Sequence, residues 1–78
     1  MRVRLLIGEE GRRHRLRKAK SLIESARWNM YAERWYTAKD ELEEARSLCV
    51  SLRDKYRIDE ILTLLAECEN KEKPEINT

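Results

Sequence analysis

WYTAKDELEEA, residues 35–45, is the stretch that decides the fold of this 78-residue chain. Its apolar or small residues are Trp35, Ala38, Leu42 and Ala45, at offsets of 0, 3, 7 and 10. Residues with this spacing lie on one face of a helix. The two alanines let a neighbouring backbone approach closely, while the tryptophan and the leucine fill the space beside them. The stretch therefore predicts a tightly packed helical hairpin.

A second apolar stripe precedes this stretch and predicts a first helix over residues 13–32. Its members recur three or four residues apart: Leu16, Ala19, Leu22, Ile23, Ala26 and Met30. Trp28 and Tyr31 fall outside the stripe. We predict a bend around Glu33, although neither glycine nor proline marks it. The alternative is one continuous helix through this residue.

The second helix is predicted over residues 35–52 and the third over residues 58–70. A turn is expected within residues 53–57, where Asp54 or Asp59 caps the third helix. The third helix has an unusually wide apolar face: Ile58, Ile61, Leu62, Leu64, Leu65, Ala66 and Cys68. Their arc is about 200°, whereas an ordinary surface helix needs about 100°. The excess predicts self-association or a protein partner.

The two ends of the chain differ from its middle. Val3, Leu5 and Ile7 alternate with other residues as in a strand, but the rest of the chain offers no second strand. We therefore expect an extended basic arm over 1–12, a three-helix domain over 13–70 and a disordered tail over 71–78. No stretch is predicted to span a membrane, and the N-terminal apolar run is too short for a signal peptide. The predicted fold is all-α, an antiparallel three-helix hairpin with a short N-terminal arm.

Charge is distributed unevenly along the chain. The net charge is +2, but residues 1–20 hold eight basic and two acidic residues, a net of +6, so the remainder carries −4. The candidate basic patch is Arg12, Arg13, Arg15, Arg17, Lys18 and Lys20. A basic segment on an acidic helical body favours contact with nucleic acid, an acidic protein or another copy of the chain.

The sequence offers no set of residues for catalysis or metal binding. Cys49 and Cys68 lie about 9 Å and about 19 Å from the predicted turn along their helices, too different for a disulfide. We expect both thiols to be reduced and buried, which favours a cytoplasmic protein. His14 stands among arginines and is expected to be solvated. The chain is thus predicted to be no enzyme and to hold no metal or cofactor.

The pattern resembles a tetratricopeptide-type helical repeat over about residues 20–69. The matching positions are Leu22 and Ala26 in the first helix, Trp35, Ala38, Leu42 and Ala45 in the second, and Leu62, Leu65 and Ala66 in the third. The sequence departs from the family at Asn29, Glu33 and Val50, where an aromatic residue, a glycine and a proline are usual. The resemblance implies a stack of helices that a partner or a second copy completes.

These features together predict a small protein-interaction module that acts as an adaptor, inhibitor or assembly factor and forms a homodimer. Trp28, Tyr36 and Leu64 are the candidate partner-binding residues, because exposed aromatic and large apolar side chains dominate binding surfaces. The alternative is a small RNA- or DNA-binding protein that acts through the basic patch.

Overall fold

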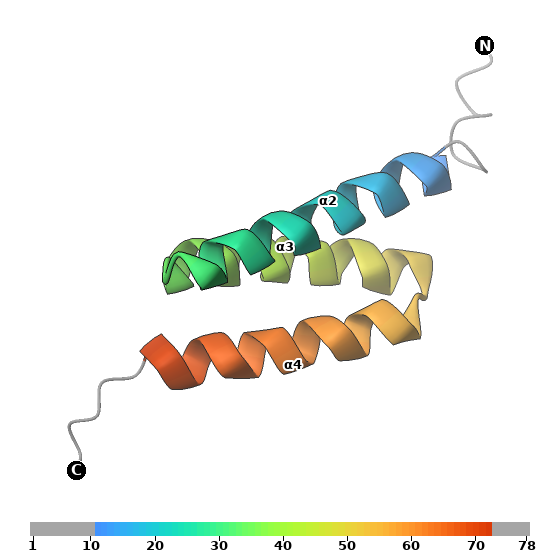
Figure 1. Ribbon diagram of the computed structural model, residues 1–78. Helices are drawn as coiled ribbons and strands as arrows, with labels where there is room; N and C mark the ends of the chain where they lie inside the picture. The colour runs from blue at the N-terminus through green and yellow to red at the C-terminus, as the bar shows by residue number, and fades with distance from the viewer. Residues whose placement is uncertain (1–10, 73–78) are drawn as a thin grey trace.

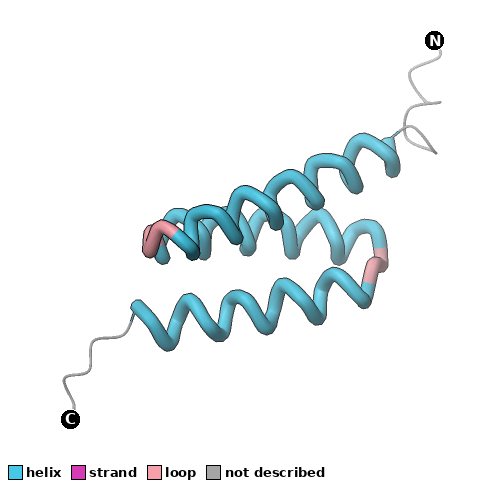
Figure 2. Tube along the Cα trace, viewed as in Figure 1, coloured by secondary structure: helices cyan, strands magenta, loops and turns pink. Residues whose placement is uncertain are grey.

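The computed structural model describes residues 11–72, which form three helices. These are α2 (Gly11–Tyr31), α3 (Trp35–Leu52) and α4 (Lys55–Glu72), each antiparallel to the next (Figure 1). Short turns join them at opposite ends of the molecule (Figure 2). The described range contains no strand, and the all-α, three-helix prediction is confirmed. The predicted strand over 2–7 and nearly all of the predicted tail lie outside the described residues.

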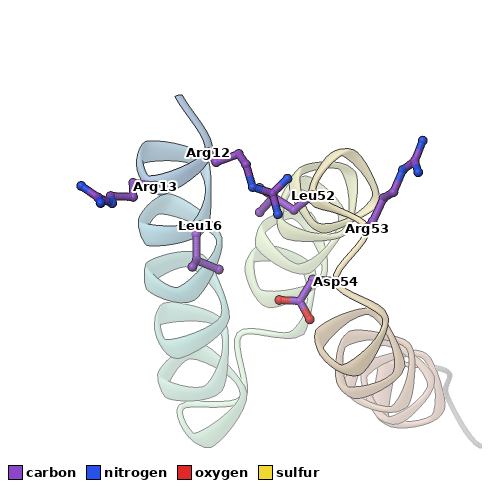
Figure 3. Close-up of a pocket in the computed structure, with 6 residues that line it drawn as sticks. All are labelled: Arg12, Arg13, Leu16, Leu52, Arg53 and Asp54. Atoms are coloured by element: carbon purple, nitrogen blue, oxygen red, sulfur yellow. The ribbon is translucent and has the colours of Figure 1, made fainter. Parts of the chain in front are cut away.

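Helix α3 lies between α2 and α4 and packs against both (Figure 1). The view along the helices in Figure 3 shows the same order, with α3 in the middle. A central helix must present apolar residues in two directions, and the stripe of α3 is wide enough to do so. Trp35, Leu42 and Cys49 extend the stripe toward one side, and Leu48 and Leu52 toward the other.

The core consists largely of small side chains. Its buried members are Ala19, Ile23, Ala26 and Met30 from α2, Ala38, Leu42, Ala45, Cys49 and Leu52 from α3, and Ile61, Leu65 and Cys68 from α4. Four alanines are fully buried, two on each side of the α2–α3 contact. Alanine at such positions brings helix axes close together, because interaxial distance depends on side-chain size at the contact. Ala38 and Ala45, the two alanines that predicted a close helix contact, are therefore part of the core, and we call them the alanine face.

Polar contacts of Glu41 fix how α2 and α3 are aligned. Its carboxylate accepts hydrogen bonds from Ser25 Oγ and Asn29 Nδ2, both at 2.8 Å. The two donors are one helical turn apart on α2, so a shift of either helix along the other breaks both bonds. Lys18 and Glu44 form an ion pair of 3.5 Å further along the same interface.

The bend predicted at Glu33 exists, and its backbone explains why no glycine marks it. Glu33 takes the left-handed conformation with φ 63°. Its amide donates to Met30 O at 2.9 Å, and the next amide, of Arg34, donates to Asn29 O at 2.7 Å. These two bonds form a Schellman motif, which ends a helix by satisfying its last carbonyl groups. Glycine is preferred at that position but is not required. Because α2 ends at this motif, the alternative of a continuous helix is wrong.

The turn between α3 and α4 is built in the same way. Arg53 has φ 57°, its amide donates to Val50 O at 3.1 Å, and the amide of Asp54 donates to Cys49 O at 3.0 Å. Asp54 then caps α4, because its Oδ1 accepts from the amide of Arg57 at 3.2 Å. Of the two predicted caps, Asp54 is therefore the correct one.

Three predicted helix boundaries are wrong by two or three residues. Helix α4 begins at Lys55 rather than at residue 58, because Asp54 and not Asp59 caps it. Helix α2 begins at Gly11, so Arg12 is helical and not part of an extended arm. Helix α4 continues through Lys71 to Glu72, so the tail does not begin at residue 71 as predicted. Extending an existing helix by a few residues costs little once the helix has nucleated. Helix α3 spans Trp35–Leu52, as predicted.

The alanine face generates a stability prediction. We expect Ala38→Leu and Ala45→Leu each to lower the free energy of unfolding by about 1–3 kcal/mol, because the added methylenes have no space between close helices. Urea unfolding followed by circular dichroism measures this loss. Ala32→Leu, at an exposed position, is the control and should cost much less. Equal stability of all three variants would show that the close contact is absent.

Candidate interaction surfaces

Three large aromatic side chains are exposed around the α2–α3 turn. Trp28 and Tyr31 lie in the last turns of α2 and are 67% and 84% exposed, and Tyr36 lies in the first turn of α3 and is 71% exposed. The rings of Trp28 and Tyr31 meet edge to face, with 6.4 Å between centroids. The Tyr36 ring instead lies beside Lys39. Because all three residues flank the same turn, we call them the aromatic cluster. It includes the predicted Trp28 and Tyr36, both of which are free to touch a partner.

The other tryptophan has a different role. Trp35 is half-buried and packs against the core, which anchors the start of α3. Tyr36, next to it, points outward, and the ammonium group of Lys39 lies 5.7 Å from its ring centroid. A shallow hollow of about 420 Å³ opens beside these residues. Its lining comes from the α2–α3 turn and the end of α4: Glu33, Arg34, Trp35, Tyr36, Thr37 and Lys71.

The predicted basic patch occupies the first turns of α2, at the end of the molecule away from the α2–α3 turn (Figure 1). Lys18 forms an ion pair with Glu44. Within residues 11–72, no ion pair is formed by the other five members, namely Arg12, Arg13, Arg15, Arg17 and Lys20. Arg15 differs from the rest because it is half-buried, and its Nε is buried without a hydrogen-bond partner in the described part. Unbalanced positive charge therefore collects at this end.

A hollow of about 340 Å³ lies between the start of α2 and the α3–α4 turn (Figure 3). Its lining residues are Arg12, Arg13, Leu16, Leu52, Arg53 and Asp54. The side chain of Arg12 reaches toward Leu52 across the hollow, whereas Arg13 and Arg53 point away from it (Figure 3). The Asp54 carboxylate faces the hollow, but its Oδ2 accepts from Arg57 Nη1 at 2.7 Å. This carboxylate is therefore already paired, and Arg53 adds to the positive charge of the patch.

A third hollow separates α2 from α4. It is lined by charged residues of both signs and one apolar residue: Lys20, Ile23, Glu24, Arg27, Arg57 and Glu60. An ion pair between Arg27 and Glu60 links the two helices across it. Three cationic and two anionic side chains line the hollow, and Arg27 and Glu60 are already paired, so we interpret this region as a structural contact between α2 and α4.

The exposed leucine of α4 is Leu62 rather than Leu64. Leu64 is half-buried and packs against the core, so its predicted exposure is wrong, while its role in partner binding stays a prediction. Leu62 is 45% exposed, and Ala66, one turn later, is exposed as well. The wide apolar arc of α4 correctly indicated uncovered apolar surface, but the arc alone does not show which of its edges faces the core.

Neither cysteine is in a disulfide, and both are buried, as predicted. Burial, together with the carboxylate of Asp54, raises the pKa of the Cys49 thiol above its ordinary value of 9.0. The thiol is therefore neutral at pH 7 and is a poor nucleophile. Residues 11–72 contain no group of three His, Cys, Asp or Glu side chains that would hold a metal ion. None of the described helices has the length and apolar character needed to cross a membrane.

Comparison of the chain with protein-family models, with curated proteins and with solved structures finds no match. We therefore infer the function from the exposed surfaces of the chain. Sequence reasoning missed Tyr31, Arg53 and Leu62 as members of these surfaces. A signal existed for Tyr31, which lies outside the apolar stripe of α2. Arg53 is far from residues 12–20 in the sequence, and the fold brings it beside the basic patch, where it lines the same hollow as Arg12 and Arg13.

The cap of α4 generates a pH prediction. Hydrogen bonds from the Arg57 side chain and amide hold the pKa of Asp54 below its ordinary value of 3.8. A lowered pKa means that ionised Asp54 stabilises the fold above pH 3.8 and that this contribution is lost as the pH falls through the lowered pKa. Asp54→Asn keeps a capping oxygen but removes the charge, so it should be less stable than wild type at pH 7 and equally stable at strongly acidic pH.

Urea unfolding of the two chains across this pH range measures the difference. Asp54→Ala is the companion variant and should lose about 1 kcal/mol at pH 7, because it removes the cap as well as the charge. If the difference between wild type and Asp54→Asn does not change with pH, the carboxylate does not support α4 through its charge.

Proposed function

We propose that this chain is a protein-interaction module that binds a partner through the aromatic cluster. The observation that carries the proposal is the exposure of Trp28, Tyr31 and Tyr36, each more than two-thirds accessible on a chain with a small core. Leaving such side chains in water forgoes the free energy of burying them, which is about 1.5–3 kcal/mol for a large apolar side chain. Tryptophan and tyrosine are also the residues most enriched among those that dominate binding energy.

The cluster is suited to binding because its members sit on helix ends rather than on a long loop. Glu33 and the half-buried Trp35 fix the turn between the two helices. Aromatic side chains on a fixed backbone lose little conformational entropy when a partner covers them. A site of this kind supports adaptor, inhibitor or assembly roles, in which the protein holds a partner and performs no chemistry on it.

We also propose that the helices stack as in a tetratricopeptide-type repeat. The supporting features are the fully buried Ala26, Ala38 and Ala45 and the packing of α4 on the opposite side of α3. Repeats of this type are stable when neighbours cover their faces. The proposal therefore agrees with self-association of the chain and with a cytoplasmic location, where free thiols persist.

Nucleic-acid binding is the second candidate function. Its support is the basic patch, five of whose six members form no ion pair within the described part of the chain. Arg13, Arg17 and Lys20 share one face of α2 and match a surface that follows a row of phosphates. The patch has no interleaved aromatic residue for base stacking, so protein binding remains the first proposal.

The proposal predicts different results for variants at the two ends of the molecule. Trp28→Ala or Tyr36→Ala should speed dissociation of the partner by an amount that corresponds to about 1–4 kcal/mol, because these side chains lie in the proposed contact. Partners are captured from native cells on the immobilised wild-type chain, identified by mass spectrometry and measured by surface plasmon resonance. Tyr56→Ala is the matched control, since Tyr56 is 79% exposed but lies on α4 at the other end.

A partner that binds wild type, Trp28→Ala and Tyr36→Ala equally well would place the contact elsewhere. The same chains are titrated with mixed single-stranded RNA and DNA at several salt concentrations. Affinity that falls steeply with salt and is lost on replacing Arg13 and Arg17 would favour the second candidate, because each phosphate contact adds about one unit of slope.

A further inference from the structure

One apolar strip of α4 runs from the edge of the core onto the exposed surface. Ile58, Leu62 and Ala66 are four residues apart and therefore lie along one side of the helix. Ile58 is half-buried at the edge of the core, whereas Leu62 and Ala66 are exposed. We call these three residues the outer strip of α4. It begins where α4 leaves the contact with α3 and continues along the surface.

Opposite charges stand at the two ends of the outer strip. Lys55 precedes Leu62 by seven residues and Glu69 follows it by seven, so all three lie nearly in line on the helix. Both charged side chains are exposed, and neither forms an ion pair within residues 11–72. The two charges therefore lie at equal distances from Leu62, the positive one at one end of the strip and the negative one at the other.

We propose that the outer strip binds a second copy of this chain, with the two α4 helices antiparallel about a two-fold axis at Leu62. The proposal rests on the proposed function in one respect, because it specifies the self-association of the interaction module. It places the dimer contact on α4 and leaves the aromatic cluster free for another partner.

The antiparallel register pairs complementary groups at every level of the contact. At the axis, Leu62 meets its own copy. One turn to either side, the large Ile58 shares a layer with the small Ala66 of the other copy, so the helices approach without a clash or a void. At each end Lys55 lies beside Glu69 of the other copy, and the symmetry makes this ion pair twice. The contact extends about 21 Å along each helix.

A parallel arrangement of the same two helices is unfavourable. It would place Lys55 beside Lys55 and Glu69 beside Glu69, so that like charges face each other at both ends. It would also place Ile58 beside Ile58 and Ala66 beside Ala66, which gives one crowded layer and one empty layer. The charge pattern thus selects the antiparallel dimer over the parallel one.

The composition of the core favours a second copy as the occupant. Only two large aliphatic side chains, Leu42 and Ile61, are completely buried in the described part, beside several alanines and the two cysteines. Small domains with little buried apolar volume gain stability from disulfides, metals or oligomerisation. Neither cysteine is in a disulfide, and the described residues offer no metal cluster. Self-association is the third of these means, and the strip is complementary to itself.

Charge reversal tests this register directly. Sedimentation equilibrium in the micromolar range should show a reversible dimer of the wild-type chain. Lys55→Glu and Glu69→Lys should each weaken the dimer about tenfold or more, because each places two like-charged contacts in the interface. The double variant Lys55→Glu with Glu69→Lys restores opposite charges and should recover the wild-type dissociation constant. Glu67→Lys makes the same charge change about 140° around the helix from Leu62 and should have little effect.

Leu62→Glu is the companion variant. It should remain monomeric with unchanged helix content by circular dichroism, because Leu62 is already partly in water in the monomer. A wild-type chain that is monomeric throughout the range overturns the proposal, as does a dimer that survives Leu62→Glu. A double charge variant that stays as weak as the single variants overturns the antiparallel register. Partner capture by the aromatic cluster is unaffected by these outcomes, so failure of the dimer and failure of the proposed function are distinguished.

Discussion

The close contact of α2 and α3 through fully buried alanines is the constraint on which the rest of the structure depends. Ala38 and Ala45 let α2 approach, and Glu41 then reaches Ser25 and Asn29 on α2 and fixes the alignment of the two helices. Helix α4 packs against another side of α3. One helix thus organises both of its neighbours, which is how a core of small side chains holds three helices together.

The sequence predicted this arrangement well where periodicity is strong. The bounds of α3 and its buried face follow from the spacing of Trp35, Ala38, Leu42 and Ala45. Apolar residues spaced three or four apart lie on a single side of a helix, and that side becomes the buried one. The start of α4 was harder to predict, since Asp54 and Asp59 are both acceptable caps and only backbone geometry chooses between them. The exposed edge of α4 was harder still. A wide apolar arc contains both Leu62 and Leu64, and the way α4 packs on the core decides which of them is covered.

The candidate surfaces also differ in how far the sequence alone could predict them. Trp28 and Tyr36 were predictable because each falls outside the apolar stripe of its helix and so points to solvent. The basic patch was visible as a run in the sequence, but its extension to Arg53 depends on the α3–α4 turn lying beside the start of α2. The fold therefore places Trp28, Tyr31 and Tyr36 at one end of the bundle and the basic patch at the other.

Native-state hydrogen exchange tests most directly whether α3 organises the fold. Amides between Leu42 and Cys49 lie on the helix that is packed on two sides, so they should open only when the whole molecule unfolds. We predict that they exchange slowest of all, with an opening free energy equal to the global value from urea unfolding. The exposed first turns of α2, around Arg13, should exchange much faster. If amides of α2 or α4 are protected more strongly than those of Leu42–Cys49, α3 is not the helix on which the others depend.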